Sequence, residues 1–152
     1  MNVETTCAFT GHRVIRDPID TAFFERCVQG LIDKGFDTFL CGMAMGFDLL
    51  AGETVVRLKK KNPQVKLIAC VPCPDQDRYF TAEDKERYRV LLAECDEVKM
   101  LSDKFYKGCM LRRDRYMVDN SSVVFGYGRN HKGGTYYTIT YAQSKKKRVI
   151  II

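Results

Sequence analysis

The sequence predicts an α/β, Rossmann-like doubly wound fold, with a mostly parallel sheet of about six strands and helices on both faces. Short apolar runs alternate with longer amphipathic runs along the whole chain, which is typical of a parallel sheet crossed over by helices. Three of the turns leading from a strand into a helix carry glycine. The length of 152 residues, of which 45% are hydrophobic, suits one domain over residues 1–152.

The first strand is expected over residues 4–10. Asp17 is the expected N-cap of the first helix, with Pro18 at its first helical position, and apolar residues at helical spacing continue until Gly35 closes the helix. Residues 36–41 are apolar enough for a buried second strand.

The second helix is predicted over residues 47–61, where Asn-Pro stops it, and the third strand over residues 65–71. Thr81 opens a Thr-Ala-Glu-Asp run that resembles a helix cap, so the third helix should start there. Residues 97–101 form a short fourth strand.

A fourth helix is predicted over residues 106–120, a fifth strand over 122–127, a fifth helix over about 135–146 and a last strand over 148–152. The fourth helix has two distinct faces. Its polar face, which could look into a cleft, comprises Arg112, Arg115, Tyr116 and Asp119; the other comprises Met110, Asp114, Met117 and Val118.

Charge and hydropathy restrict the function classes. The formal net charge of +6 mildly favours anionic ligands without selecting DNA over a nucleotide. No apolar run approaches the length of a membrane span, and the first residues lack the pattern of a signal peptide, so we expect a soluble, cytoplasmic protein without a membrane partner.

The seven cysteines are scattered through apolar segments, which suits free thiols in a core. Cys70 and Cys73 have the C-x-x-C spacing, but a structural zinc site would need a second pair, and the only histidines are His12 and His131. We therefore predict no metal and no resident cofactor, although a nucleotide-derived ligand could bind.

The functional prediction rests on the three glycine-bearing loops. In a doubly wound sheet, all strand-to-helix loops lie along the carboxyl edge, where ligands bind at a topological switch point. Glycine permits close backbone approach, and the free N–H groups of a helix start favour a phosphate. The loop residues predicted to bind a phosphorylated, ribose-bearing ligand are Thr10, Gly11, His12, Arg13, Gly42, Met43, Ala44, Gly46, Asp48, Gly133, Gly134 and Thr135.

These motifs resemble a known family. Residues 10–13, 42–48 with Glu53, 115–119, and 133–135 leading to Tyr141 look like the YpsA/YoqJ branch of the SLOG superfamily, which also contains the DNA-processing protein DprA/Smf and the LOG phosphoribohydrolases. The resemblance implies a Rossmann-like fold with a pocket for nucleotides or derivatives such as ADP-ribose.

The chain departs from the LOG pattern at one position. LOG enzymes carry Gly-Gly-x-Gly-Thr-x-x-Glu, in which the glutamate is implicated in cleaving the bond between base and ribose phosphate, whereas Thr138 stands at that position here. A threonine cannot act as a carboxylate base, so the LOG activity is not carried over. The sequence favours binding over catalysis and leaves the enzyme question open.

Each candidate also has a structural reading. The glycines could be turn formers, Asp48 could cap its helix or contact a ribose hydroxyl, and Arg13 could clamp phosphate or be merely solvated. Arg115 and Asp119 are spaced for an i, i+4 ion pair on a solvent-facing helix, or become ligand contacts if that helix faces the cleft. Glu53, on a different helix face from Asp48, could lie at an interface.

Three hypotheses follow. The first is binding or sensing of a nucleotide-like small molecule, because no convincing nucleophile and base pair is present. The second is hydrolysis of an N-glycosidic or phosphate bond with Asp48 or Asp119 as the carboxylate. The third is single-stranded nucleic-acid binding of the DprA type, which the absence of a basic run interleaved with aromatics weakens. Aromatic side chains near Tyr136 would suit a homodimer.

Overall fold

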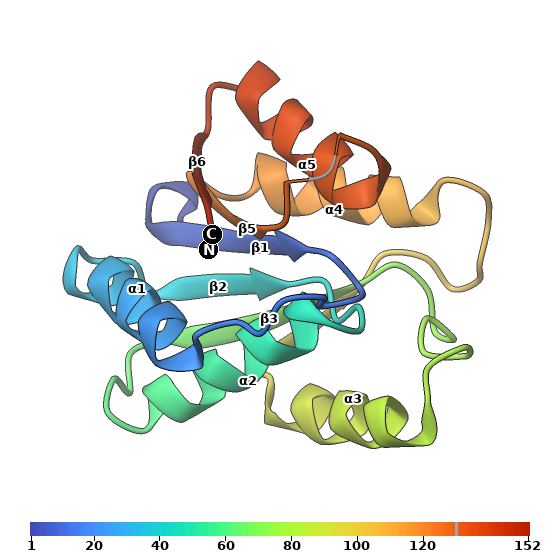
Figure 1. Ribbon diagram of the computed structural model, residues 1–152, viewed down its shortest axis with the longest axis horizontal. Coiled ribbons are helices and arrows are strands. Elements are labelled where there is room, and N and C mark those ends of the chain that lie inside the picture. The colour runs from blue at the N-terminus through green and yellow to red at the C-terminus, as the bar shows by residue number, and fades with distance from the viewer. Residues whose placement is uncertain (130) are drawn as a thin grey trace.

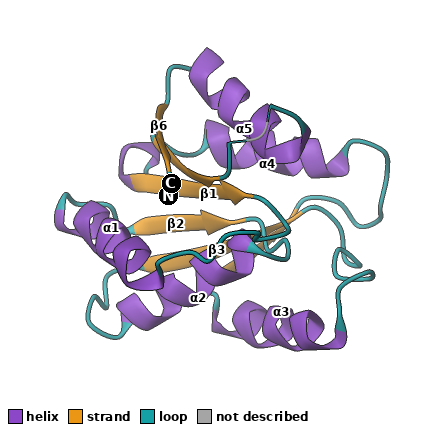
Figure 2. Cartoon of the chain, in the orientation of Figure 1, coloured by secondary structure: helices purple, strands orange, loops and turns teal. Residues whose placement is uncertain are grey.

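A computed structural model describes residues 1–129 and 131–152. One six-stranded sheet runs through the molecule, and all its strand pairs are parallel (Figure 2). The predicted α/β, Rossmann-like fold is confirmed. The strands are β1 (Thr6–Gly11), β2 (Thr38–Cys41), β3 (Lys66–Val71), β4 (Glu97–Met100), β5 (Val123–Tyr127) and β6 (Arg148–Ile151), in the spatial order β4-β3-β2-β1-β5-β6.

The helices cover both faces of the sheet (Figure 1). Buried side chains of α1, α2 and α3 pack with those of β1 to β3 in one apolar cluster, while α4 and α5 pack over a second cluster on the opposite face. The helices are α1 (Thr21–Asp33), α2 (Phe47–Lys59), α3 (Ala82–Glu94), α4 (Cys109–Asp119) and α5 (Gly133–Ser144), and a 3₁₀ turn covers Val3–Thr5.

The strand order places a topological switch point between β1 and β5. The chain leaves β1 for α1 on one face of the sheet and leaves β5 for α5 on the other (Figure 1). The two loops therefore diverge at the carboxyl edge and leave a crevice between them, which is where ligands bind in open α/β sheets.

Two helix starts test the capping predictions. Thr81 caps α3 as expected, because its hydroxyl accepts from the Asp84 N–H at 3.1 Å. The predicted start of α1 at Asp17 and Pro18 is wrong. Asp20 is the N-cap, and its carboxylate accepts from the Phe23 N–H at 3.0 Å, so the helix begins three residues after Pro18. Both aspartates can cap a helix, and the Asp20 start keeps Phe24, Val28 and Leu31 buried against the sheet.

None of the helices in residues 1–129 and 131–152 is long and apolar enough to cross a membrane. The seven cysteines are free thiols, and burial raises the pKa of Cys70 to about 12 and that of Cys73 to about 11. Thiols with raised pKa are poor nucleophiles and poor metal ligands at neutral pH.

Candidate functional site

A cleft of about 350 Å³ opens at the carboxyl edge, beside the switch point. All three glycine-bearing loops contribute to it, and α4 closes its remaining side. Arg13 is exposed and belongs to its wall. The lining residues are Phe9, Thr10, Gly11, His12, Arg13, Ala44, Asp48, Met110, Leu111, Arg113, Asp114, Lys132, Gly133, Gly134 and Thr135.

The start of α5 is the part of the cleft best suited to an anion. Lys132 is the N-cap residue, and no side chain caps this helix start. Gly133 has a φ of +88°, and a Cβ built on Gly134 would meet nothing nearer than Asp114 Oδ2 at 4.0 Å. The backbone N–H groups of the first turn have no intrahelical partners, so they can donate to a phosphate here.

The loops after β1 and β2, which also line the cleft, pack tightly against each other. The Phe47 N–H donates to the His12 carbonyl oxygen at 3.2 Å. A Cβ on Gly46, whose φ is +80°, would lie 2.3 Å from the Arg13 carbonyl oxygen, and one on Gly11 would lie 2.4 Å from the Phe47 ring. Gly11 and Gly46 are therefore required for loop packing, whether or not a ligand also approaches them.

His12 is held in a fixed position at the crevice. The backbone N–H of His12 donates to the Tyr127 carbonyl oxygen at 3.2 Å, and the imidazole ring occupies the space where a Cβ on Gly128 would lie. The Nε2 atom is buried and has no hydrogen-bond partner among the residues that the structure describes. The ring therefore keeps a free polar atom at the edge of the cleft.

The floor of the cleft holds a buried arginine that the sequence reasoning did not single out. Arg113 is 4% exposed, and its guanidinium donates to the Gly42 carbonyl, to the Cys70 carbonyl at 3.4 Å, and from Nε to Asp114 Oδ1 at 2.7 Å. Burial alone would lower the pKa of Arg113, but the neighbouring carboxylates of Asp114 and Asp48 raise it, so the arginine stays charged.

Asp48 is the other buried charge at this floor. It is 6% exposed, and its Oδ2 accepts from the Ala44 N–H at 3.3 Å. Burial raises the pKa of Asp48 to about 7, although the charge of Arg113 and the Ala44 hydrogen bond lower it. The cap of α2 is Gly46, so Asp48 supports the loop before the helix and does not cap it.

The face of α4 predicted to look into the cleft is the wrong one. The helix turns Met110, Arg113 and Asp114 to the cleft, while Arg112 is exposed and donates to the Leu101 carbonyl. Met110 and Met117 lie on one stripe at helical spacing, and Arg113 and Asp114 fall on the same stripe. That spacing is the signal that could have identified Arg113.

Arg115 and Asp119 lie between α4 and α5 and are absent from the described lining of the cleft. Arg115 donates to the Tyr137 hydroxyl at 3.0 Å, and the Tyr141 hydroxyl donates to Asp119 Oδ1 at 2.8 Å. Within the described residues these contacts replace the predicted i, i+4 ion pair. Both residues therefore join the two helices.

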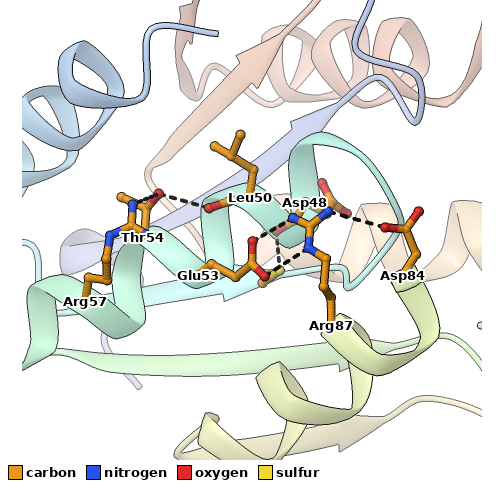
Figure 3. Close-up of polar contacts among 8 residues, drawn as sticks. Asp48, Leu50, Glu53, Thr54, Arg57, Asp84 and Arg87 are labelled. Carbon is orange, nitrogen blue, oxygen red and sulfur yellow. Dashed lines mark hydrogen bonds and ion pairs between the residues drawn. The ribbon is translucent and has the colours of Figure 1, made fainter. Parts of the chain in front are cut away.

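Three further loop residues have supporting positions. The Gly42 carbonyl accepts hydrogen bonds from Arg113 and from the Gln76 amide. Met43 is fully buried and has a φ of 61°. Gly42, Met43 and Gly46 are not among the described residues that line the cleft. Glu53 lies at an interface, because its carboxylate accepts two hydrogen bonds from Arg87 of α3, at 2.6 and 3.0 Å (Figure 3). Hydrogen bonds from Arg113, Gln76 and Arg87 thus hold both the loop before α2 and the helix itself in place.

A second cavity, of about 550 Å³, shares His12 and Arg13 with the cleft. Three arginines, Arg13, Arg16 and Arg129, line it together with Tyr127. Asp17 is the one acidic residue among its described lining residues. Its charge suits an extended anion.

Within residues 1–129 and 131–152, no group of three or more His, Cys, Asp or Glu side chains is arranged to hold a metal ion. The cleft therefore offers backbone N–H groups, hydroxyls and cationic side chains as its ligand-binding groups.

Comparison with known proteins identifies relatives over most of the chain. The family model YpsA, described as the YspA SLOG family, matches residues 11–150. The SPbeta prophage-derived protein YoqJ of Bacillus subtilis is 32% identical over 117 residues, which cover 69% of this chain and 68% of YoqJ. The UPF0398 protein BH1768 of Halalkalibacterium halodurans is 26% identical over 128 residues, covering 82% of this chain and 68% of that protein.

Solved structures with the same fold include DNA processing protein A from two bacteria. The Helicobacter pylori protein, whose structure is described in terms of a single-stranded DNA binding mode, superposes with a TM-score of 0.66 at 20% identity, over 96% of this chain and 64% of that one. The Streptococcus pneumoniae protein gives a TM-score of 0.65 at 18% identity, over 96% of this chain and 49% of that one. The chain thus spans less than two thirds of either structure.

Proposed function

The chain belongs to the YpsA SLOG family, and we propose that its cleft binds the phosphate of a nucleotide-derived small molecule such as ADP-ribose or AMP. The observation that carries this proposal is the uncapped, open start of α5 at Gly133 and Gly134, which faces the loop after β1. A helix start with free N–H groups is a ready anion site.

The side chains that line the cleft around the start of α5 suit a phosphate. Thr10 and Thr135 supply hydroxyl donors, and Lys132 and Arg13 supply positive charge from two different loops. Because Arg13 is exposed, it can close over a bound phosphate with paired N–H groups. Asp114 lies beside Gly134, where its carboxylate could accept hydrogen bonds from ribose hydroxyls.

We further propose that the ligand is bound and not cleaved. Thr138 is 4% exposed, and its hydroxyl donates to the Gly134 carbonyl of its own helix at 2.8 Å, so it is directed away from a ligand. The carboxylate of Asp114 accepts from Arg113, which holds it in a fixed salt bridge. At the α5 start, the described lining of the cleft therefore offers no carboxylate outside an ion pair that could replace the glutamate of the LOG pattern.

A second candidate function is single-stranded DNA binding, which the second cavity favours. Arg13, Arg16 and Arg129 line that cavity together with Tyr127, and cations combined with an aromatic side chain suit a nucleic-acid backbone with stacked bases. The structural similarity to the Helicobacter pylori protein supports the same candidate. The two cavities share Arg13, so variants must act on one cavity at a time.

The test compares two ligand classes on two variants. Thermal shift and calorimetry against ADP-ribose, AMP and a single-stranded oligonucleotide would be run on the wild-type chain, Gly134→Val and Arg16→Glu. We expect nucleotides to stabilise the wild-type protein and Arg16→Glu, but not Gly134→Val. Chromatography after long incubation should return the nucleotide intact.

Two outcomes would redirect the assignment. Release of a free base or ribose 5-phosphate, lost in Asp48→Asn, would show an enzyme. Salt-sensitive binding to single-stranded DNA that Arg16→Glu removes, with no response to any nucleotide, would favour the nucleic-acid function.

A further inference from the structure

Strand β4 forms an open edge of the sheet. Among the described residues it pairs with β3 alone, and its four residues are all exposed. Val98 and Met100 are each 44% exposed, so the edge carries apolar as well as charged side chains. An edge strand presents unpaired N–H and C=O groups, which form a template for another strand.

The direction of the peptide groups identifies which residues face outward. The Leu101 N–H donates to the Val71 carbonyl of β3 at 2.9 Å, in register with the pairing of Met100 with Val71. Peptide groups alternate along a strand, so Glu97 and Lys99 also direct theirs to β3, while Val98 and Met100 direct theirs to the open edge. Two outward N–H groups and two outward carbonyls are therefore available.

The two residues that flank Val98 carry opposite charges on one face of the sheet. Glu97 and Lys99 are two residues apart, and the Lys99 Nζ lies 5.9 Å from the ring centre of Tyr116 in α4, which fixes that face as the one covered by α4. Neither Glu97 nor Lys99 takes part in an ion pair within the described part of the chain.

We propose that β4 pairs antiparallel with β4 of a second copy of this chain, about a two-fold axis through Val98. In this register Glu97 lies opposite the partner's Lys99, and Lys99 lies opposite the partner's Glu97. Val98 and the partner's Val98 form a hydrogen-bonded pair with two backbone hydrogen bonds, and the two charged pairs flank it as non-hydrogen-bonded pairs, whose side chains lie closer together.

Charge excludes the neighbouring registers. Backbone pairing requires outward residues opposite outward residues, so the axis can pass only through successive residues such as 97, 98 or 99. An axis through Glu97 would place two glutamates face to face, and an axis through Lys99 would place two lysines face to face, which is destabilising. The Val98 axis is the one that pairs unlike charges.

The antiparallel arrangement would join two six-stranded sheets into one of twelve strands, with the two carboxyl edges on opposite sides. Each ligand cleft remains complete within one copy, because residues of β4 do not belong to its described lining. The proposal is therefore independent of the proposed ligand function.

Charge exchange provides the test, with mass measured by sedimentation and native mass spectrometry. The wild-type chain should show a concentration-dependent species at twice 17.5 kDa. Glu97→Lys and Lys99→Glu should each be monomeric, because each places like charges opposite one another. An equal mixture of the two variants should form mixed dimers, and the double variant Glu97→Lys/Lys99→Glu should dimerise again.

Two further variants act as controls. Glu4→Lys makes the same change of charge on an exposed residue before β1 and should dimerise like the wild type. Val98→Pro removes the outward N–H at the axis without the charge repulsion and should also give a monomer, and circular dichroism would verify that each variant is folded. A wild-type chain that stays monomeric at every concentration, or single variants that dimerise as the wild type does, would overturn the proposal.

Discussion

The guanidinium of Arg113 donates a hydrogen bond to the carbonyl oxygen of Gly42, which ties helix α4 to the loop after β2. A Cβ on Gly42 would lie 2.9 Å from both Arg113 Nη1 and Asp48 Oδ2, so glycine is needed for the two charged groups to approach this point. The floor of the cleft thus holds one arginine, Arg113, between the carboxylates of Asp48 and Asp114, and each of these charges can be tested separately.

Replacing Arg113 should destabilise the fold. Arg113→Met leaves the buried carboxylate of Asp48 without its nearby cation, and loss of one partner of a buried charged group typically costs about 3–5 kcal/mol. Urea unfolding measures the loss. Arg112→Met, the same change at the exposed neighbouring position, should have little effect, and Asp48→Asn should recover part of the stability in the double variant.

The pKa of Asp48 predicts a pH dependence of stability. The folded state holds the proton up to about pH 7, whereas an unfolded aspartate releases it near 3.8. Between these values the folded state binds more protons, so the Asp48 contribution to stability should fall as pH rises through this window and stay constant above it. Asp48→Asn should be more stable than the wild type at pH 8, with a flatter profile of melting temperature between pH 4 and 7. An unchanged profile would contradict the assignment.

Gly134→Val should abolish nucleotide binding in a folded protein. The space around a Cβ at this position is open, so the side chain fits, but it occupies the place where a phosphate would approach the α5 N–H groups. We expect at least a tenfold loss of affinity by calorimetry with an unchanged melting temperature. Gly30→Val, in open space on α1, is the matched control and should bind normally. Full nucleotide affinity in Gly134→Val would show that the start of α5 does not bind the ligand.

Gly46→Val should behave differently and destabilise the fold. The added Cβ would meet the Arg13 carbonyl at 2.3 Å, and a φ of +80° disfavours a branched residue. Left-handed strain and overpacking together should cost about 2–5 kcal/mol. Chemical denaturation would detect this loss, and a variant as stable as the wild type would show that the two loops are not locked together.

Arg115 and Asp119 should prove to be structural. Arg115→Met and Asp119→Asn remove contacts with the hydroxyls of Tyr137 and Tyr141, so each should slightly lower the melting temperature. Nucleotide affinity should stay within about twofold of the wild type, because neither change moves the α5 start. A large loss of affinity with unchanged stability would restore both residues to the ligand site.

The sequence by itself determined the order and type of the elements. Apolar periodicity, Thr81 as a cap and proline or glycine at helix ends act over a few residues, so they can be interpreted locally, and the structure has every predicted strand and helix. The same local signals placed three glycine loops at the carboxyl edge of a parallel sheet, where they meet in one cleft.

Only the tertiary structure decided which side chains form the floor of that cleft. Arg113 and Gly42 are 71 residues apart, and the burial of the arginine depends on how α4 is rotated over the sheet. Local periodicity gives the faces of a helix but not the direction in which each face points, so the polar face of α4 was assigned to the cleft in error. Gly46 is needed because the backbone of Arg13 lies against it, a long-range contact that no pattern within the loop itself encodes.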